Sequence, residues 1–254
     1  MGSIGNINEP DRRINVLVTG FGPFQERFPV NPSWEITRSL PKTLPIIKPD
    51  GRTIQIFTYD TPIRVSYEEV RQLVPALHES FLGTVDLILH IGMSSGRDFY
   101  TAEKFAHRDG YDKNKDLDGL TLSTDHCLAY FGDCPSVMTT SLNCDRIVDR
   151  WQANVTSLAN KLPGFKADCR LSEDAGHYLC DYIYFNSLSC CGRRRGVLDG
   201  GNVESRPVLF LHVPAESDTA TLERGRHVTM ALIEAMVDDW CASRSSHAQV
   251  SLVA

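Results

Sequence analysis

The sequence predicts an α/β protein, a three-layer α/β/α sandwich with a mostly parallel central sheet. Short apolar segments rich in valine, isoleucine and leucine recur along the chain, and such segments are typical of strands buried on both faces. Between them lie longer segments whose apolar residues recur at helical spacing. Strands that alternate with helices in this way favour a parallel sheet covered by helices on both sides.

Each element can be placed on the chain from its pattern. Strands are predicted at residues 14–19, 53–59, 85–91, 99–107 and 207–213. Helices are predicted at residues 34–40, 66–82, 145–162 and 219–243, with a further helix inside 172–188. Asn31 or Ser33 is expected to cap the first helix, and Pro75 is expected to kink or split the second.

Composition limits the function classes. The 254 residues carry a net charge of −6, which gives no reason to expect a nucleic-acid or membrane partner. The chain starts without the apolar core of a signal peptide, and no apolar run is long enough to span a bilayer, so we expect a cytoplasmic protein. One domain is expected over 14–244, between a loose tail over 1–13 and a frayed end over 245–254.

The eight cysteines show neither CxxC pairs nor zinc-site spacing, so we expect reduced thiols and no metal. Cys180 is the candidate nucleophile among them. Ser172 or Asp174 is a good N-cap for the helix that contains it, which would put Cys180 in the first turn or two. The positive end of a helix lowers a thiol pKa and favours the thiolate. The alternative, and the commoner case, is a buried cysteine that packs like a small hydrophobic residue.

A catalytic thiol needs an imidazole and a group that orients it. His212 lies near the end of an apolar strand, at the sheet edge where ligands of α/β proteins gather. On position alone, a hydrogen-bonded core histidine explains His212 better. Glu103 lies in a mildly apolar segment, where an unpaired carboxylate would be unfavourable, so it is the candidate orienting group. Its alternative is a structural ion pair with Lys104 or Arg97.

Three loops are also candidates for function. Phe21 and Phe24 follow the first strand in a Gly/Pro loop, where they either line a pocket or anchor the loop by packing. Residues 92–97 form a small-residue turn, but they lack the glycine spacing of a nucleotide site. Residues 108–125 form a long polar loop, which is either a lid over a binding site or a solvated excursion.

The sequence resembles the pyroglutamyl peptidase I family of cysteine peptidases. The resemblance rests on motifs in the family's order: VTGFGPF at 18–24 with NPSWE at 31–35, HIGMSSGRDFYTAE at 90–103, SEDAGHYLCDYIYF at 172–185 and FLHVP at 210–214. Together these motifs touch most of the chain from residue 14 to about residue 240. The long 108–125 loop is similar to that of a fungal-type or other eukaryotic member.

The resemblance implies a catalytic triad of Glu103, Cys180 and His212. It also implies a slot for the five-membered lactam ring of pyroglutamate. The residues that match the family's substrate-binding positions are Phe21, Phe24, Asn31, Arg97, Tyr178 and Leu179. Among these, Asn31 is expected to hold the N-terminal loop and Arg97 to lie near the active site, on the oxyanion side.

Five positions depart from the family pattern. Gln25 and Glu26 replace a glycine pair, and Met93 stands where a glutamine is usual. Lys104 replaces an arginine, and Asp181 replaces the asparagine after the nucleophile. Asp181 is expected to place a negative charge beside the thiolate and to oppose its ionisation. None of the five is a triad residue, so the departures bear on efficiency and specificity.

The function that the resemblance implies is that of a cysteine exopeptidase without a metal or organic cofactor. It would remove an N-terminal pyroglutamyl (5-oxoproline) residue from peptides through an acyl-enzyme. Its partners would be peptides with N-terminal pyroglutamate, and the sequence leaves a homo-oligomer open. Two alternatives stay open. One is a weak or inactive relative that binds lactam-capped peptides, and the other is a nucleoside- or nucleotide-binding domain that uses the 92–97 turn.

Overall fold

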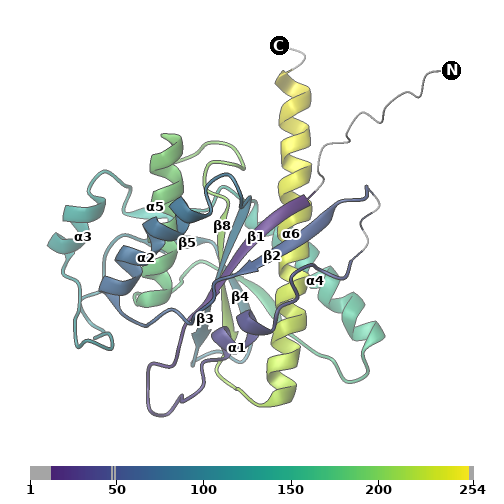
Figure 1. The fold of residues 1–254 in the computed structure, drawn as a ribbon, viewed down its shortest axis with the longest axis horizontal. Coiled ribbons are helices and arrows are strands. Elements are labelled where there is room, and N and C mark those ends of the chain that lie inside the picture. Colours follow the sequence, from purple (N-terminus) through teal and green to yellow (C-terminus); the bar gives the residue numbers. More distant parts are fainter. Residues whose placement is uncertain (1–12, 47, 49, 252–254) are drawn as a thin grey trace.

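The computed structural model describes residues 13–46, 48 and 50–251, and it confirms the predicted α/β/α sandwich (Figure 1). Six strands form the central sheet in the order β2-β1-β3-β8-β4-β7. Their bounds are β1 Arg13–Gly20, β2 Thr53–Thr58, β3 Leu87–Ser94, β4 Tyr100–Glu103, β7 Cys169–Ser172 and β8 Val208–Pro214. Strands β2, β1, β3 and β8 run parallel, whereas β4 is antiparallel to β8 and parallel to β7.

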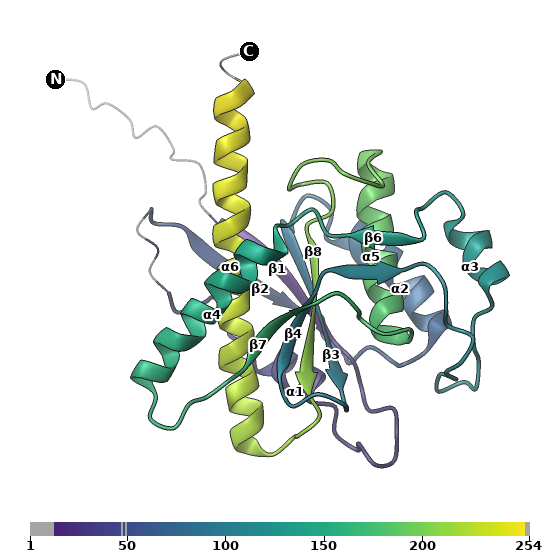
Figure 2. The same cartoon turned by 180° about the vertical axis from the view of Figure 1, so that it is seen from behind.

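Helices cover both faces of this sheet (Figures 1 and 2). One face carries α1 (Pro32–Ser39), α4 (Cys144–Lys161) and α6 (Thr219–Ser251). The other carries α2 (Tyr67–Ser80) and α5 (Leu179–Arg195), with α3 (Thr124–Phe131) at their outer side. A two-stranded ribbon of β5 (Phe105–His107) and β6 (Val137–Thr139) lies against α5. Strands β3 and β8 are almost wholly buried because helices pack on both of their faces.

The helix starts follow the capping chemistry of the sequence. The Asn31 side chain accepts a hydrogen bond from the Ser33 backbone N–H, so Asn31 is the N-cap of α1. The Ser66 hydroxyl caps α2 in the same way. Helix α2 continues through Pro75 as one helix, so the predicted split does not occur.

Short elements are where the prediction and the structure differ. The single strand predicted over 99–107 is two strands, β4 and β5, which belong to different sheets. The elements β6, β7 and α3 have 3, 4 and 8 residues, and none of them was predicted. The strands β6 and β7 hold too few apolar positions for a period to be recognised.

The structure describes only parts of the two predicted tails. Helix α6 continues to Ser251, so the frayed end expected over 245–254 is helical as far as the structure describes it. Of the tail expected over 1–13, Arg13 belongs to β1, and residues 1–12 lie outside the described residues. In the part of the chain that the structure describes, no helix has the length and apolar content that crossing a membrane requires.

Trp151 tests the packing of α4 on α6. Its side chain is fully buried, and its Nε1 donates to the Val228 carbonyl at 2.9 Å. Trp151→Ala should lower the free energy of unfolding by about 3–5 kcal/mol, because it leaves a cavity and removes this hydrogen bond. Urea denaturation followed by circular dichroism measures the loss. Trp151→Phe should lose less, and an alanine variant as stable as the wild type would contradict the assignment.

Candidate active site

The pairing of β4 with β8 brings four side chains to one face of the sheet. In this antiparallel register Thr101 lies opposite His212, and Glu103 lies opposite Phe210. Residues two apart on a strand point to the same face, and Phe210 packs in the core beneath α5, so all four side chains lie on that face. They lie toward the carboxyl ends of β3 and β8, at the lower edge of the sheet in Figure 1.

Glu103 is completely buried, and its Oε1 is surrounded by hydrogen-bond donors. His212 Nδ1 lies 2.8 Å from this oxygen, Thr101 Oγ1 donates at 2.6 Å and Arg97 Nη1 donates at 2.7 Å. Tyr184 of α5 donates from its hydroxyl to the Glu103 carbonyl oxygen at 3.0 Å and ties α5 to β4. Glu103 therefore contacts the imidazole and also has the ion pair with Arg97 that the sequence left as an alternative.

Cys180 is the second residue of α5, and its side chain is partly exposed. The helix begins later than its predicted caps. Ser172 ends β7 and Asp174 lies in the loop that follows, and the N-cap is Tyr178, which makes no side-chain capping bond. The first backbone N–H groups of α5 therefore lack a capping side chain, at the end of the helix where the dipole is positive.

Strand β3 passes directly behind the Cys180 sulfur at Gly92. A Cβ atom added at Gly92 would lie 2.7 Å from Cys180 Sγ and 2.7 Å from the Phe210 ring, closer than real contacts. Glycine is therefore required for the sulfur to rest against β3. Gly92 also lies opposite His212 in the parallel register of β3 and β8. Neither Gly92 nor Thr101 was predicted as a site residue, although Thr101 lies two positions before Glu103, the spacing that puts both on one face.

Hydrogen bonds and neighbouring charges stabilise the ionised forms of Glu103 and His212, which burial alone would disfavour. Burial by itself would raise the pKa of Glu103, but the hydrogen bond with His212, the charge of His212 and the hydrogen bond from Thr101 outweigh it and lower the pKa. Burial would likewise lower the pKa of His212. The charge of Cys180, a side-chain hydrogen bond with it and the Glu103 carboxylate instead raise that pKa from 6.5 to about 9. The imidazole therefore holds its proton at neutral pH.

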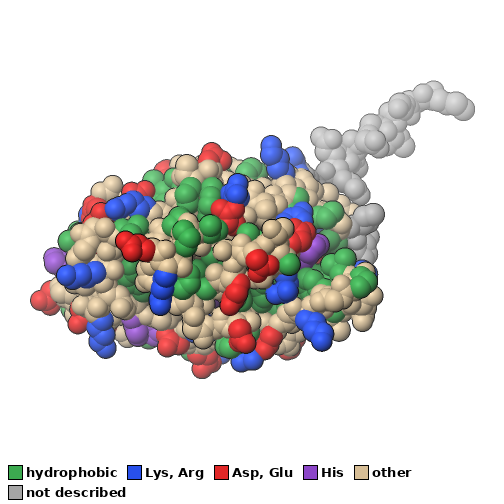
Figure 3. Space-filling model, turned by 90° about the horizontal axis from the view of Figure 1, so that it is seen from below, with side chains coloured by type: hydrophobic (Ala, Val, Ile, Leu, Met, Phe, Trp, Pro, Cys, Tyr) green, Lys and Arg blue, Asp and Glu red, His purple; other side chains and the backbone are tan. Residues whose placement is uncertain are grey.

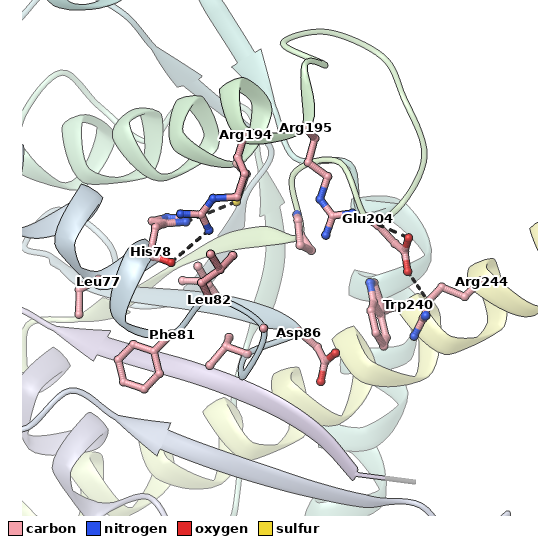
Figure 4. Close-up of a pocket in the computed structure, with 15 residues that line it drawn as sticks. Leu77, His78, Phe81, Leu82, Asp86, Arg194, Arg195, Glu204, Trp240 and Arg244 are labelled. Carbon is pink, nitrogen blue, oxygen red and sulfur yellow. Dashed lines mark hydrogen bonds and ion pairs between the residues drawn. The ribbon is translucent and has the colours of Figure 1, made fainter. Parts of the chain in front are cut away.

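A second cysteine and histidine lie together at the opposite edge of the sheet (Figure 4). Cys191 Sγ lies 3.7 Å from His78 Nδ1, on a cavity of about 320 Å³ at the amino ends of β3 and β8. Burial lowers the pKa of His78 to about 4, and burial raises the pKa of Cys191 to about 12. His78 Nε2 lies 2.7 Å from the Ser187 hydroxyl. The ring of His78 thus has a hydroxyl as its partner, whereas the ring of His212 has a carboxylate. Both members of this pair are thus neutral at physiological pH.

All eight cysteines are free thiols, as predicted. Burial raises the thiol pKa at six further positions, which are Cys127, Cys134, Cys144, Cys169, Cys190 and Cys241. These thiols are poor nucleophiles at neutral pH, because the thiolate is the reactive form.

The expected substrate-binding residues divide into two groups. Phe24 and Tyr178 are partly exposed, and their ring centroids lie 6.3 Å apart. Phe21 and Leu179 are buried in the core beneath them, with 3% and 1% of their surface exposed. Of the two alternatives for the phenylalanine loop, Phe21 therefore fits the packing anchor, whereas Phe24 is placed to form a wall.

Asn31 and Arg97 both act as supports. Asn31 Nδ2 donates to the Gly22 carbonyl at 2.8 Å, and this bond ties the Phe21–Phe24 loop to the start of α1. Arg97, expected on the oxyanion side, instead binds the Glu103 carboxylate and donates from Nη2 to the Asp174 carbonyl at 3.0 Å. Its guanidinium therefore links the carboxylate to the loop before α5.

The long loop over 108–125 is organised around one buried carboxylate. Asp116 accepts hydrogen bonds from the backbone N–H groups of Tyr67, Asp118 and Leu120. Tyr178 Oη donates to a carbonyl oxygen of this loop at 2.9 Å. The loop thus contacts the aromatic wall next to Cys180. On the face that Figure 3 shows, acidic and basic side chains are interspersed among hydrophobic ones.

The family departures lie mostly outside this constellation. Lys104 pairs with Glu173 at 3.2 Å, Met93 is buried in β3, and both Gln25 and Glu26 are exposed. Asp181, expected beside the thiolate, is buried with its carboxylate bound elsewhere. It accepts from the His107 backbone N–H at 3.0 Å and lies 3.1 Å from His107 Nδ1. Burial raises the pKa of Asp181, and His107 partly offsets that rise.

The 92–97 turn does not form a phosphate-binding loop. Strand β3 continues to Ser94, and the chain then passes through a short turn into β4. No helix follows this turn, so it lacks the helix N-terminus that binds phosphate in nucleotide sites.

Comparisons with known proteins agree with this geometry. A sequence profile of the pyroglutamyl peptidase family matches residues 14–236. Human pyroglutamyl-peptidase 1 is 31% identical over 225 residues, which cover 88% of this chain and 90% of the relative. The pyrrolidone-carboxylate peptidase of Thermosipho africanus is 24% identical over 206 residues, 79% of this chain and 82% of the relative. A solved mutant pyrrolidone carboxyl peptidase of Pyrococcus furiosus has the same fold, with a TM-score of 0.65 and 20% identity, covering 89% of this chain and 99% of that one.

The ring of His212 should titrate near pH 9, and NMR of its ring carbon-bound protons measures this. Because the folded pKa lies above the unfolded value of 6.5, the stabilisation is complete below about pH 6.5 and is lost as the pH rises through about 9. The melting temperature should fall over that range. Glu103→Gln should lower the His212 pKa, since it removes the carboxylate. A wild-type pKa at or below 6.5 would contradict this account.

Gly92→Ala should slow alkylation of Cys180 by roughly tenfold or more, because the new methyl group displaces the sulfur. Peptide mass spectrometry after timed iodoacetamide labelling measures the rate at this cysteine. Gly96→Ala is the matched control, because a Cβ atom there meets nothing within 4 Å. Equal labelling rates in the two variants would show that β3 does not position the sulfur.

Proposed function

This chain belongs to the pyroglutamyl peptidase family, and from that premise we propose that it removes the N-terminal pyroglutamyl residue from peptides as a cysteine peptidase. One observation carries the proposal. The buried Glu103 carboxylate lies 2.8 Å from Nδ1 of the His212 ring, and Gly92, directly behind the Cys180 sulfur, lies opposite His212 in the register of β3 and β8. These are the three parts of an activated nucleophile: an attacking atom, a base and a group that orients the base.

Cys180 is the proposed nucleophile. Its thiolate attacks the carbonyl carbon that joins pyroglutamate to the next residue, which forms a carbon–sulfur bond and an oxyanion. Protonated His212 donates its proton to the leaving amine as the carbon–nitrogen bond breaks, and a pyroglutamyl thioester remains. The now neutral His212 accepts a proton from water, whose oxygen attacks the thioester. Free pyroglutamate leaves, and the thiolate and imidazolium are restored.

Glu103 is proposed to orient the imidazole. With Nδ1 bound to the carboxylate, Nε2 is the nitrogen left to face the sulfur and the leaving group. Thr101 and Arg97 keep the carboxylate in place and ionised. Both are therefore proposed as positioning residues, and Arg97 is no longer assigned to the oxyanion.

The amino end of α5 is proposed to bind the oxyanion. Its first N–H groups have no capping side chain, so they are free to donate to a charge that develops beside Cys180. Removal of one such donor typically lowers the rate by about 100- to 1000-fold.

A neutral lactam suits the surroundings of Cys180. Pyroglutamate has no free α-amine, so a site built to bind an ammonium group would reject it. We place the lactam ring between Phe24 and Tyr178, two partly exposed aromatic side chains. Neighbouring residues hold both of these side chains in position. Phe21 and Leu179 pack beneath them, and Asn31 holds the loop that carries Phe24. The substrates proposed are therefore peptides with N-terminal pyroglutamate.

The thiol chemistry also bears on the compartment. Eight free cysteines in one chain are typical of proteins in reducing surroundings. We therefore propose the cytoplasm, and assays should include a reductant.

Hydrolysis of a fluorogenic pyroglutamyl amide by the purified chain tests the function. The wild type should release the fluorophore, and prior alkylation should abolish the release. Cys180→Ala should lower the rate by at least about 1000-fold while circular dichroism shows that the protein stays folded, because the nucleophile is lost. Cys191→Ser is the matched control, since Cys191 also lies beside a histidine but lacks the carboxylate.

Retained activity in Cys180→Ala would exclude Cys180 as the nucleophile. If folded wild-type protein releases no fluorophore, calorimetry with a pyroglutamyl peptide distinguishes the two remaining hypotheses. Binding without turnover would identify an inactive lactam-binding relative, and absence of binding would reject the pyroglutamyl pocket itself.

A further inference from the structure

Three metal-ligating side chains converge at one point close to α5. His107 ends β5, His177 lies in the loop before α5, and Asp181 lies in the first turn of α5. Asp181 Oδ2 lies 3.1 Å from His107 Nδ1 and 3.7 Å from His177 Nδ1. One ligand atom from each residue lies within 4.8 Å of the other two. No step of the proposed hydrolysis uses these groups.

The separations fit a tetrahedral zinc ion. Zinc binds imidazole nitrogen and carboxylate oxygen at about 2.0–2.2 Å, so its ligand atoms lie about 3.4 Å from each other. The two nitrogen–oxygen distances of 3.1 and 3.7 Å fall on either side of that value. The His177 side chain is 46% exposed, so its ring has the freedom to move closer to His107.

The carboxylate is already oriented for such an ion. Asp181 Oδ1 accepts from the His107 backbone N–H at 3.0 Å, and Tyr111 Oη donates to Oδ2 at 3.2 Å. Outer hydrogen bonds of this kind orient the ligands of metal sites. The neighbouring Gly110 leaves room for the His177 ring, since a Cβ atom there would lie 2.8 Å from Nδ1. The carboxylate is buried, whereas both rings reach solvent, so an ion can enter from their side.

We propose that His107, His177 and Asp181 bind a zinc ion, with a water molecule as the fourth ligand. Two imidazoles, one carboxylate and an open position form a ligand set that zinc accepts. The ion replaces the direct contact between His107 and Asp181 and brings in His177. It thereby links β5 to the loop and the first turn that carry Cys180. This site is separate from the Cys180–His212 pair and does not depend on the proposed reaction.

Calorimetric titration of the full-length chain with zinc chloride tests the site. Cys180 and His212 are themselves zinc-binding groups, so the titration uses the Cys180→Ser protein, in which one ion per chain should still bind. Adding His177→Ala, at a partly exposed position, should weaken binding by more than the roughly 10- to 100-fold that loss of an outer partner costs. Adding Asp181→Asn, which preserves the shape of the buried group, should do the same.

His227→Ala is the matched control, because His227 also pairs with a carboxylate, Glu223, at 3.2 Å. Adding His227→Ala to the Cys180→Ser protein should leave the affinity for zinc unchanged. Zinc should also raise the melting temperature of the Cys180→Ser protein, and this rise should disappear with His177→Ala.

Cobalt(II) provides a second measurement on the unmodified chain. Bound to two imidazoles and a carboxylate, it should give visible d–d bands that survive Cys180→Ser and disappear with His177→Ala. Three results would overturn the proposal. They are no zinc binding by the Cys180→Ser protein, unchanged affinity after His177→Ala, and a cobalt spectrum that consists only of a thiolate band lost with Cys180.

Discussion

The buried carboxylate of Glu103 is the constraint on which the site depends. An ionised carboxylate is unfavourable in a protein interior unless donors surround it. Thr101, Arg97 and His212 all meet the same oxygen, Oε1. The reversal of β4 against β8 makes this possible, because the antiparallel register sets Thr101 and Glu103 beside Phe210 and His212. The antiparallel pairing of β4 with β8, in a sheet whose other strand pairs are parallel, thus brings the charged groups of the site together.

The chain contains two cysteine–histidine pairs, Cys180–His212 and Cys191–His78, and comparing them shows what makes a thiol reactive. Cys191 and His78 lie 3.7 Å apart, yet burial leaves the histidine with a pKa of about 4. His212 is buried as well, and its pKa is about 9. The difference lies in the neighbours: the charge of Cys180 and the Glu103 carboxylate both raise the pKa of His212, whereas Arg194 lowers the pKa of His78, whose Nε2 contacts a hydroxyl. Proximity of sulfur and imidazole is therefore not sufficient to charge the pair, and the surrounding charges also matter.

Periodicity was enough to predict the layers of the fold, and the motifs named three residues, Glu103, Cys180 and His212, that the structure brings to one end of the sheet. The long strands and helices have repeating apolar patterns, so most of their bounds agree with the structure to within a few residues, although α5 and α6 continue beyond their predicted ends, to Arg195 and Ser251. What failed depended on contacts between distant segments. The start of α5 could not be read from Ser172 or Asp174, because the chain stays in a loop until Tyr178. The direction of the Asp181 side chain depends on His107, far away in sequence, and the need for glycine at position 92 arises only when α5 is packed on β3.

The hydrogen bond from Tyr184 to the Glu103 carbonyl makes the site resistant to local unfolding. It joins α5 to β4, while β4 pairs with β8, so the elements that carry Cys180, Glu103 and His212 are all tied to one another. Segments packed in this way open to solvent together with the whole domain, whereas loops open on their own. Thermal fluctuations short of complete unfolding will therefore displace the loops at Phe24 and at residues 108–125 before they separate Cys180, His212 and Glu103.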